Sequence, residues 1–205
     1  MFGAWADKYS ETSTILLING ETAYFQRNPI LKNRCHTFEL NLYQEHSSVM
    51  SFGKLKAQDH SAADAMAKIF DEHETDEFDG VVTPNAAFGH QKIIKQFIAD
   101  VLNTFEAFNC YSDGCDWAAV NYLWYKQRLS NGSSISYKIR SRPEGFGQVH
   151  PVFELKQMQE RHLYDAKNKI FKNRDKTVSP VILHYHDPKE YFDAKAKSLL
   201  AEENA

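Results

Sequence analysis

The densest group of potential ligands in this sequence lies near its C-terminal end. His184, His186 and Asp187 stand within four consecutive residues. Side chains two residues apart on a strand point to the same face, so the two imidazoles could share one metal ion or one phosphate. Asp187 would add a carboxylate at the strand end. The alternative is that both histidines only contact neighbours within the fold, and the residues alone leave both interpretations open.

A second group of polar residues directly follows the apolar run of residues 14–18. Asn19 supplies an amide oxygen and Glu21 a carboxylate. Oxygen ligands at the end of a buried strand suit Mg²⁺ or Mn²⁺, and such a cation can offset the charge of a departing nucleotide diphosphate. A plain connection from strand to turn is the alternative, because a single carboxylate holds such an ion weakly.

Two further segments in the middle of the chain have residue types that suit ligand binding. Small residues around Asn85 and Ala86, followed by Gly89, would let a ligand approach the backbone closely, although these residues alone favour a tight strand-to-helix turn. Asp116 stands at the start of a predicted amphipathic helix that also carries Asn121. A carboxylate there can cap the helix, orient an acceptor hydroxyl or act as a base.

Hydrophobic periodicity predicts the elements that would position these residues. Helices are predicted over 2–9, 61–70, 90–105, 116–126, 155–171 and 189–201. Strands are predicted over 14–18, 38–43, 49–52, 80–83, 134–140 and 180–186. Strands that alternate with helices indicate the α/β class, in which residues past the strand ends line the binding crevice. The apolar run of residues 14–18 is typical of a parallel strand covered on both faces.

The composition excludes several classes of protein. With 205 residues, 42% of them hydrophobic, and a net charge of −3, the chain fits one globular domain and not a disordered or strongly basic nucleic-acid-binding protein. Residues 126–176 are locally basic and could attract a diphosphate, although a solvated basic surface explains them as well. Cys35, Cys110 and Cys115 are expected to be free thiols in a reducing compartment. No signal peptide or membrane span is expected, and an intracellular or organellar location follows.

Taken in order, these segments resemble a GT-A-fold glycosyltransferase, which transfers a sugar from a nucleotide-sugar donor. Residues 25–29 (FQRNP) and 116–123 (DWAAVNYL) are the more specific matches, while 85–89 and 182–187 are weaker singly. The order and spacing of these motifs agree with the family pattern over residues 2–190. This stretch corresponds to the C-terminal two-thirds of a family domain. The resemblance implies an α/β fold with an incomplete GT-A-like, Rossmann-related mixed sheet flanked by helices.

The resemblance also implies roles for individual residues. Asp116 would be catalytic, because it matches the family's aspartate that binds the transferred sugar or activates the acceptor. Donor or acceptor binding would involve Asn85, Ala86, Asn121 and His186. A divalent cation, Mn²⁺ or Mg²⁺, would be held by Asn19, Glu21, His184 and Asp187.

This chain departs from the family pattern in two ways. Asn19 and Thr22 stand where the family has its metal-binding aspartates, and the usual N-terminal nucleotide-binding strands are missing from the single domain expected over 1–205. The first expected function is therefore sugar transfer from a nucleotide-sugar to a hydroxyl acceptor. The alternative is a catalytically inactive glycosyltransferase-like subunit with a structural or binding role, completed by a protein partner or by oligomerisation.

Overall fold

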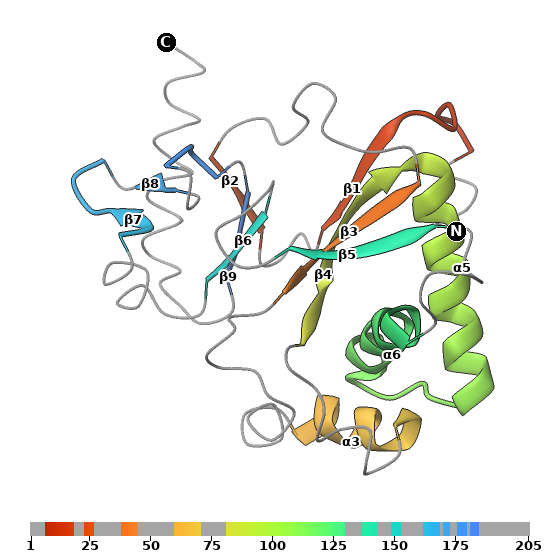
Figure 1. The fold of residues 1–205 in the computed structure, drawn as a ribbon. Helices are drawn as coiled ribbons and strands as arrows, with labels where there is room; N and C mark the ends of the chain where they lie inside the picture. Colours follow the sequence, from red (N-terminus) through yellow and green to blue (C-terminus); the bar gives the residue numbers. More distant parts are fainter. Residues whose placement is uncertain are drawn as a thin grey trace. The chain divides into compact units, whose positions relative to one another are not determined.

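The computed structural model describes residues 7–18, 23–26, 38–44, 60–70, 81–129, 137–142, 149–152, 162–168, 170–172, 176–179 and 181–184. The chain divides into two compact units. The first comprises Met1–Ile18 and Ile30–Glu144, and the second Asn19–Pro29 and Gly145–Ala205. Figure 1 shows the strands and helices of both.

A four-stranded mixed sheet forms the centre of the first unit, in the order β1-β4-β3-β5. Its strands are β1 (Thr14–Ile18), β3 (Glu39–Gln44), β4 (Val82–His90) and β5 (Lys138–Arg142). Strand β4 is antiparallel to both β1 and β3, whereas β3 and β5 are parallel. The mixed sheet with flanking helices confirms the α/β class predicted from the sequence.

Strand β1 differs from its predicted environment. It pairs antiparallel with β4 at one end of the strand order, and only Ile15 among its five residues is buried. The prediction that residues 14–18 form a parallel strand covered on both faces is therefore wrong. Apolar runs of this length indicate a strand, but they contain no information on its direction or its place in the sheet. Strand β3 is buried at every residue except its last, and its Leu40 and Leu42 are completely inaccessible.

Strand β4 runs through the segment that was expected to be a turn. Its register pairs residues 86–90 with β1, and residues 82–83 and 87–88 with β3. Pro84 and Asn85 fall at the step between these pairings, where the β3 register shifts between Leu42 and Tyr43. A proline has no N–H to donate, so this irregular step is where a strand can contain one.

Among the described residues, three helices accompany the sheet: α3 (His60–Ile69), α5 (Gln91–Phe108) and α6 (Cys115–Leu129). Helix α5 buries Ile93, Ile94 and Phe97 of the apolar face that its periodicity predicts, whereas Leu102, on the same predicted face, is exposed. Its C-cap, Asn109, has φ of 48°, a left-handed conformation that asparagine tolerates and that ends the helix. Helix α6 lies between the sheet and α3, so it is covered on two sides (Figure 1).

Small residues allow α3 and α6 to approach closely. Ala62 on α3 and Ala118 on α6 are completely buried. Just before α6, Gly114 has φ of 84°, and a Cβ added there would lie 2.5 Å from the Ala62 Cα. Beyond this contact, Phe70 packs edge-on against Tyr122 with ring centroids 5.8 Å apart. The loop before α6 is thus fixed against the backbone of α3.

A partly buried hydrogen bond connects α5 to the start of β5. The Tyr137 hydroxyl donates to an Asp100 carboxylate oxygen at 2.9 Å, and the Thr104 hydroxyl donates to the Asp100 main-chain carbonyl. Burial raises the pKa of the Tyr137 phenol far above its usual value, and the negative charge of Asp100 raises it further. Tyr137 therefore stays protonated and donates this bond throughout the physiological pH range.

The second unit contains a three-stranded and a two-stranded sheet. Strands β2 (Ala23–Phe25), β9 (Val181–His184) and β6 (Val149–Val152) have the order β2-β9-β6, and β7 (Tyr164–Asp165) pairs with β8 (Ile170–Phe171).

The pair β7 and β8 shows that the helix predicted over residues 155–171 is wrong in its described part. Asp165 accepts hydrogen bonds from Lys172 and from the main-chain and side-chain nitrogens of Asn168, which fix a turn. The Lys172 hydrogen bond, followed by those of Asn168, holds the pKa of the Asp165 carboxyl well below its usual range. Local side-chain hydrogen bonds of this kind compete with helix formation.

Other predicted elements can be compared only in part. Residues 7–9 of the predicted first helix form turns, whereas the strand over 49–52 and the helix over 189–201 lie outside the described residues. In the part of the chain that is described, no helix has both the length and the apolar character that crossing a membrane requires.

Candidate functional site

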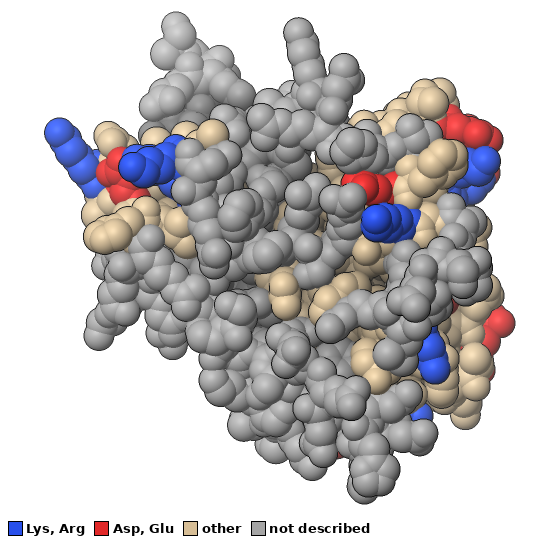
Figure 2. Space-filling view, viewed as in Figure 1, with Lys and Arg blue, Asp and Glu red and all other residues tan. Residues whose placement is uncertain are grey.

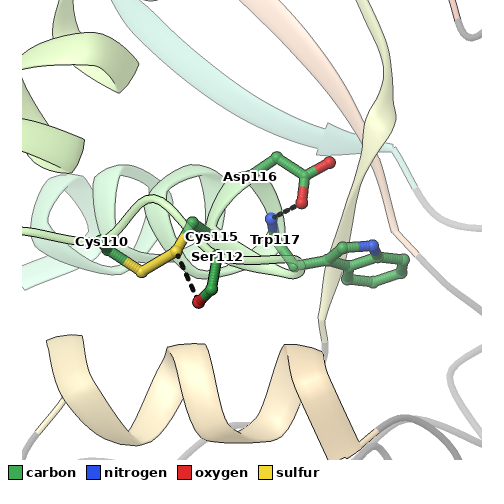
Figure 3. Close-up of a disulfide and its surroundings, with 5 residues drawn as sticks. All are labelled: Cys110, Ser112, Cys115, Asp116 and Trp117. Atoms are coloured by element: carbon green, nitrogen blue, oxygen red, sulfur yellow. Dashed lines mark hydrogen bonds between the residues drawn. A yellow bond between two sulfur atoms is a disulfide. The ribbon is translucent and has the colours of Figure 1, made fainter.

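Asp116 is an exposed carboxylate in the first turn of α6. One of its oxygens, Oδ1, accepts a hydrogen bond from the Trp117 main-chain nitrogen at 2.8 Å, and this is its only hydrogen bond to the described residues. Figure 3 shows the carboxylate on the opposite side of the helix start from the Cys110–Cys115 disulfide. The predicted position at a helix start is confirmed, and the other oxygen is available to a ligand hydroxyl.

Asn121 is completely buried and links α6 to the sheet. Its Oδ1 accepts from the Val82 main-chain nitrogen at 2.8 Å, while its Nδ2 donates to the carbonyls of Val82 and Trp117 at 2.9 and 2.8 Å. The amide thus binds both main-chain groups of Val82, much as a neighbouring strand would. The suggested donor- or acceptor-binding role remains a prediction, and the geometry gives Asn121 a structural role.

Asn85 and Ala86 lie within β4 and not in a loop beyond a strand end. Ala86 is buried and pairs with Ile18 of β1, whereas Asn85 is half-buried at the irregular step of β4. The Asn85 main-chain nitrogen donates to the Thr83 hydroxyl at 3.1 Å. Gly89, proposed to admit a ligand, instead packs against β3, because a Cβ there would lie 3.2 Å from the Glu39 carbonyl oxygen.

The residues suggested for the metal fall in the second unit or outside the described residues. His184 is the last residue of β9, paired with Val152, and Asn19, Glu21, His186 and Asp187 lie outside the described ranges. Within those ranges, no three histidine, cysteine or acidic residues gather closely enough to hold a metal ion. The divalent cation therefore remains a prediction.

Gln26, in the other specific motif, uses its amide in the same way as Asn121. Its Nε2 donates to the carbonyls of Phe171 and Ser179 at 3.0 and 2.7 Å, and its Oε1 accepts from the Phe171 main-chain nitrogen at 3.0 Å. This side chain joins the end of β2 to β8 and to the segment before β9. Both specific motifs therefore contain an amide that binds the main chain of a distant segment.

Replacing Gln26 with glutamate is expected to lower the free energy of unfolding of the second unit by about 3 kcal/mol. The carboxylate keeps the size of the side chain but cannot donate to the two carbonyls, and it places negative charge beside them. Hydrogen exchange at the Phe171 and Ser179 amides checks this, with faster exchange expected. Unchanged protection at both amides would show that Gln26 does not hold this unit together.

The disulfide between Cys110 and Cys115 is a feature that sequence reasoning missed. The two Cα atoms lie 5.7 Å apart, within the range that a disulfide bridges. Asn109 ends α5 directly before Cys110, and Gly114 adopts positive φ directly before Cys115, so the chain reverses direction tightly. The expectation of free thiols is wrong for these two residues. The available signal was the pair of turn residues, asparagine and glycine, around a Cys-x4-Cys spacing.

A surface groove of about 480 Å³ lies elsewhere in the first unit, between residues 7–11 and the first turns of α5. Lys95 pairs with Asp7, and Lys92 lies 3.9 Å from Glu11. Figure 2 shows described acidic and basic side chains side by side on the face in view. The paired charges leave this groove without a strong preference for an anion or a cation, and none of the suggested site residues lines it.

Comparisons with known proteins complete the description of the site. No protein-family model, curated protein or solved structure matches the chain significantly.

Proposed function

We propose that the chain is a glycosyltransferase-like domain that transfers a sugar from a nucleotide-sugar to a hydroxyl acceptor, with Asp116 as its catalytic carboxylate. The observation that carries this proposal is the exposure of Asp116. In the segment 115–124, packing explains the buried alanines, Val120, Asn121 and Trp124. Asp116 is the one charged residue of this segment, and no buried contact accounts for it.

A carboxylate at this position has two chemical uses in sugar transfer. It can accept hydrogen bonds from sugar hydroxyls and so orient the donor. It can also take the proton of the acceptor hydroxyl while that oxygen bonds to the anomeric carbon and the bond from carbon to the diphosphate oxygen breaks. If Mg²⁺ or Mn²⁺ binds, Asn19, Glu21, His184 and Asp187 are the residues proposed to hold it, and the ion would offset the diphosphate charge.

Calorimetric titration of the full chain with UDP- and GDP-sugars, with and without Mn²⁺, tests the proposal. Binding of at least one donor, followed by its slow hydrolysis or by transfer to a simple hydroxyl acceptor, is the expected result. An absence of heat with every donor at millimolar concentration would exclude an autonomous transferase.

Replacing Asp116 with asparagine is expected to lower turnover of the bound donor by about 100-fold or more, the usual contribution of a general base. The stability should change by less than about 1 kcal/mol, because only a helix-end interaction of an exposed residue is altered. Asp113→Asn is the matched control, since Asp113 is an exposed carboxylate in the turn directly before α6. Equal activity of the two variants would remove Asp116 from the mechanism.

A second candidate function is a catalytically inactive subunit with a structural or binding role in a larger assembly. The observation that favours it is the use of Asn121 and Gln26 by main-chain groups, because selection for folding alone would retain both motif residues. For an inactive subunit, we expect that no nucleotide-sugar donor binds and that the Asp116 variant behaves as the parent. We also expect a stable complex with a protein partner or with a second copy of the chain.

A further inference from the structure

The turn between α5 and α6 is closed by a disulfide that is almost completely buried. Cys110 is completely buried, and Cys115 is 3% exposed. We propose that this bond is structural, that it closes before α3 packs over the turn, and that the chain therefore folds where a disulfide-bearing oxidant is present. The proposal does not depend on the proposed function.

Contacts around the turn show why the disulfide has to form before α3 packs over it. The backbone of Gly114 packs directly on α3, where a Cβ would lie within 2.7 Å of the Ala62 Cα and nitrogen and of the Ser61 carbonyl oxygen. In the same turn, the Cys115 nitrogen donates to the Ser112 carbonyl. Figure 3 shows the disulfide on the side of α6 that faces α3. A thiolate needs direct access to a sulfur atom, so this packed turn blocks exchange once it has formed.

The chemistry of bond formation is two successive thiol–disulfide exchanges. The thiolate of one cysteine attacks the oxidant's disulfide, forms a mixed disulfide and releases one thiol. The second cysteine's thiolate then attacks its neighbour's sulfur and releases the second thiol. Two protein thiols are oxidised with loss of two protons, and one oxidant disulfide is reduced. Such bonds persist in oxidising compartments, which revises the reducing compartment expected from the cysteine count.

Mass-resolved labelling of thiols with a maleimide tests the bond and its burial in the full chain. In denaturant without reductant, only Cys35 should be labelled, while denaturant with reductant should expose all three cysteines. Native protein kept in millimolar dithiothreitol should remain unlabelled at Cys110 and Cys115. Labelling of either residue in the unreduced, denatured chain would disprove the bond. Rapid labelling of the native chain after mild reduction would show an accessible switch and not a structural bond.

Refolding of the reduced chain tests the role of the oxidant. Oxidised glutathione should increase the yield of protein with slow hydrogen exchange in α6, whereas the Cys110→Ala/Cys115→Ala double variant should refold with the same yield with and without it. We expect the double variant to melt about 5–10 °C lower than the parent. The matched control, Cys35→Ala, should keep the dependence on oxidant. Equal parent yields with and without oxidised glutathione would overturn the proposed order.

Discussion

Gly114→Ala is expected to lower the free energy of unfolding of the first unit by about 3 kcal/mol or more. Two effects act together: a φ of 84° is unfavourable for alanine, and its Cβ would overlap the Ala62 Cα, the Ala62 nitrogen and the Ser61 carbonyl oxygen. All three clashing atoms belong to the backbone of α3, so no side-chain rotation can relieve the overlap. Urea unfolding followed by tryptophan fluorescence measures the loss, because Trp117 and Trp124 lie on α6.

Gly89→Ala is the matched comparison for this substitution. Its Cβ would lie 3.2 Å from the Glu39 carbonyl oxygen and would need a shift of only a few tenths of an ångström. A loss of about 1 kcal/mol is therefore expected, clearly smaller than at Gly114. If both variants lost the same stability, the close contact between the turn and α3 would not be the cause.

Asn121→Asp is expected to cost about 4 kcal/mol, the largest loss predicted for a change that preserves side-chain size. The carboxylate would still accept from the Val82 nitrogen, but its other oxygen would face the carbonyls of Val82 and Trp117, to which the amide now donates. The site is completely inaccessible to solvent, so water cannot replace the lost bonds. Urea unfolding and hydrogen exchange at the Val82 amide provide the measurement.

The same asparagine-to-aspartate substitution at Asn103 provides the control. Asn103 is an exposed residue of α5, and Asn103→Asp should change the stability by less than about 0.5 kcal/mol. If Asn121→Asp instead folded with parental stability and lost donor binding, Asn121 would be a ligand-binding residue and not a structural one.

Elements with strong periodicity were predictable from the sequence. Helix α5 buries the N-terminal part of the stripe that its pattern indicated, namely Ile93, Ile94 and Phe97, and α6 was found from the spacing of Trp117, Val120 and Trp124. The apolar face of α5 follows from the 3.6-residue repeat, whereas α6 is covered by the sheet on one side and by α3 on the other. Strands β1, β3 and β9 were also predicted from the sequence, and their predicted bounds lie within a few residues of the observed ones.

Other features depend on tertiary pairing, which a local pattern does not contain. The segment around Pro84 resembled a turn because proline and small residues are common in turns, yet strand pairing on both sides keeps it in β4. The antiparallel direction of β1 is set by its partner strand. Closure of the disulfide required the turn that brings Cys110 next to Cys115.

Of the candidate site, the sequence correctly placed Asp116 at a helix start. It did not reveal that Asn121 and Gln26 bind the main chain, because an amide in a motif can serve a ligand or the backbone equally well. Burial of the amide decides whether it serves a ligand or the backbone. That burial depends on segments far away in the sequence, as Val82 is from Asn121. The binding of a divalent cation by Asn19, Glu21, His184 and Asp187 remains a prediction from the sequence.

The pairing of β2 with β9 has a consequence for synthesis on the ribosome. Tyr24 pairs with Ile182, so the two segments are about 160 residues apart in the chain. At ordinary rates of translation, β2 waits roughly ten to thirty seconds for its partner to be made. The sheet of the first unit has all its strands once Arg142 has emerged. A nascent chain can therefore complete that sheet first, while the apolar β2 segment is still without its neighbour.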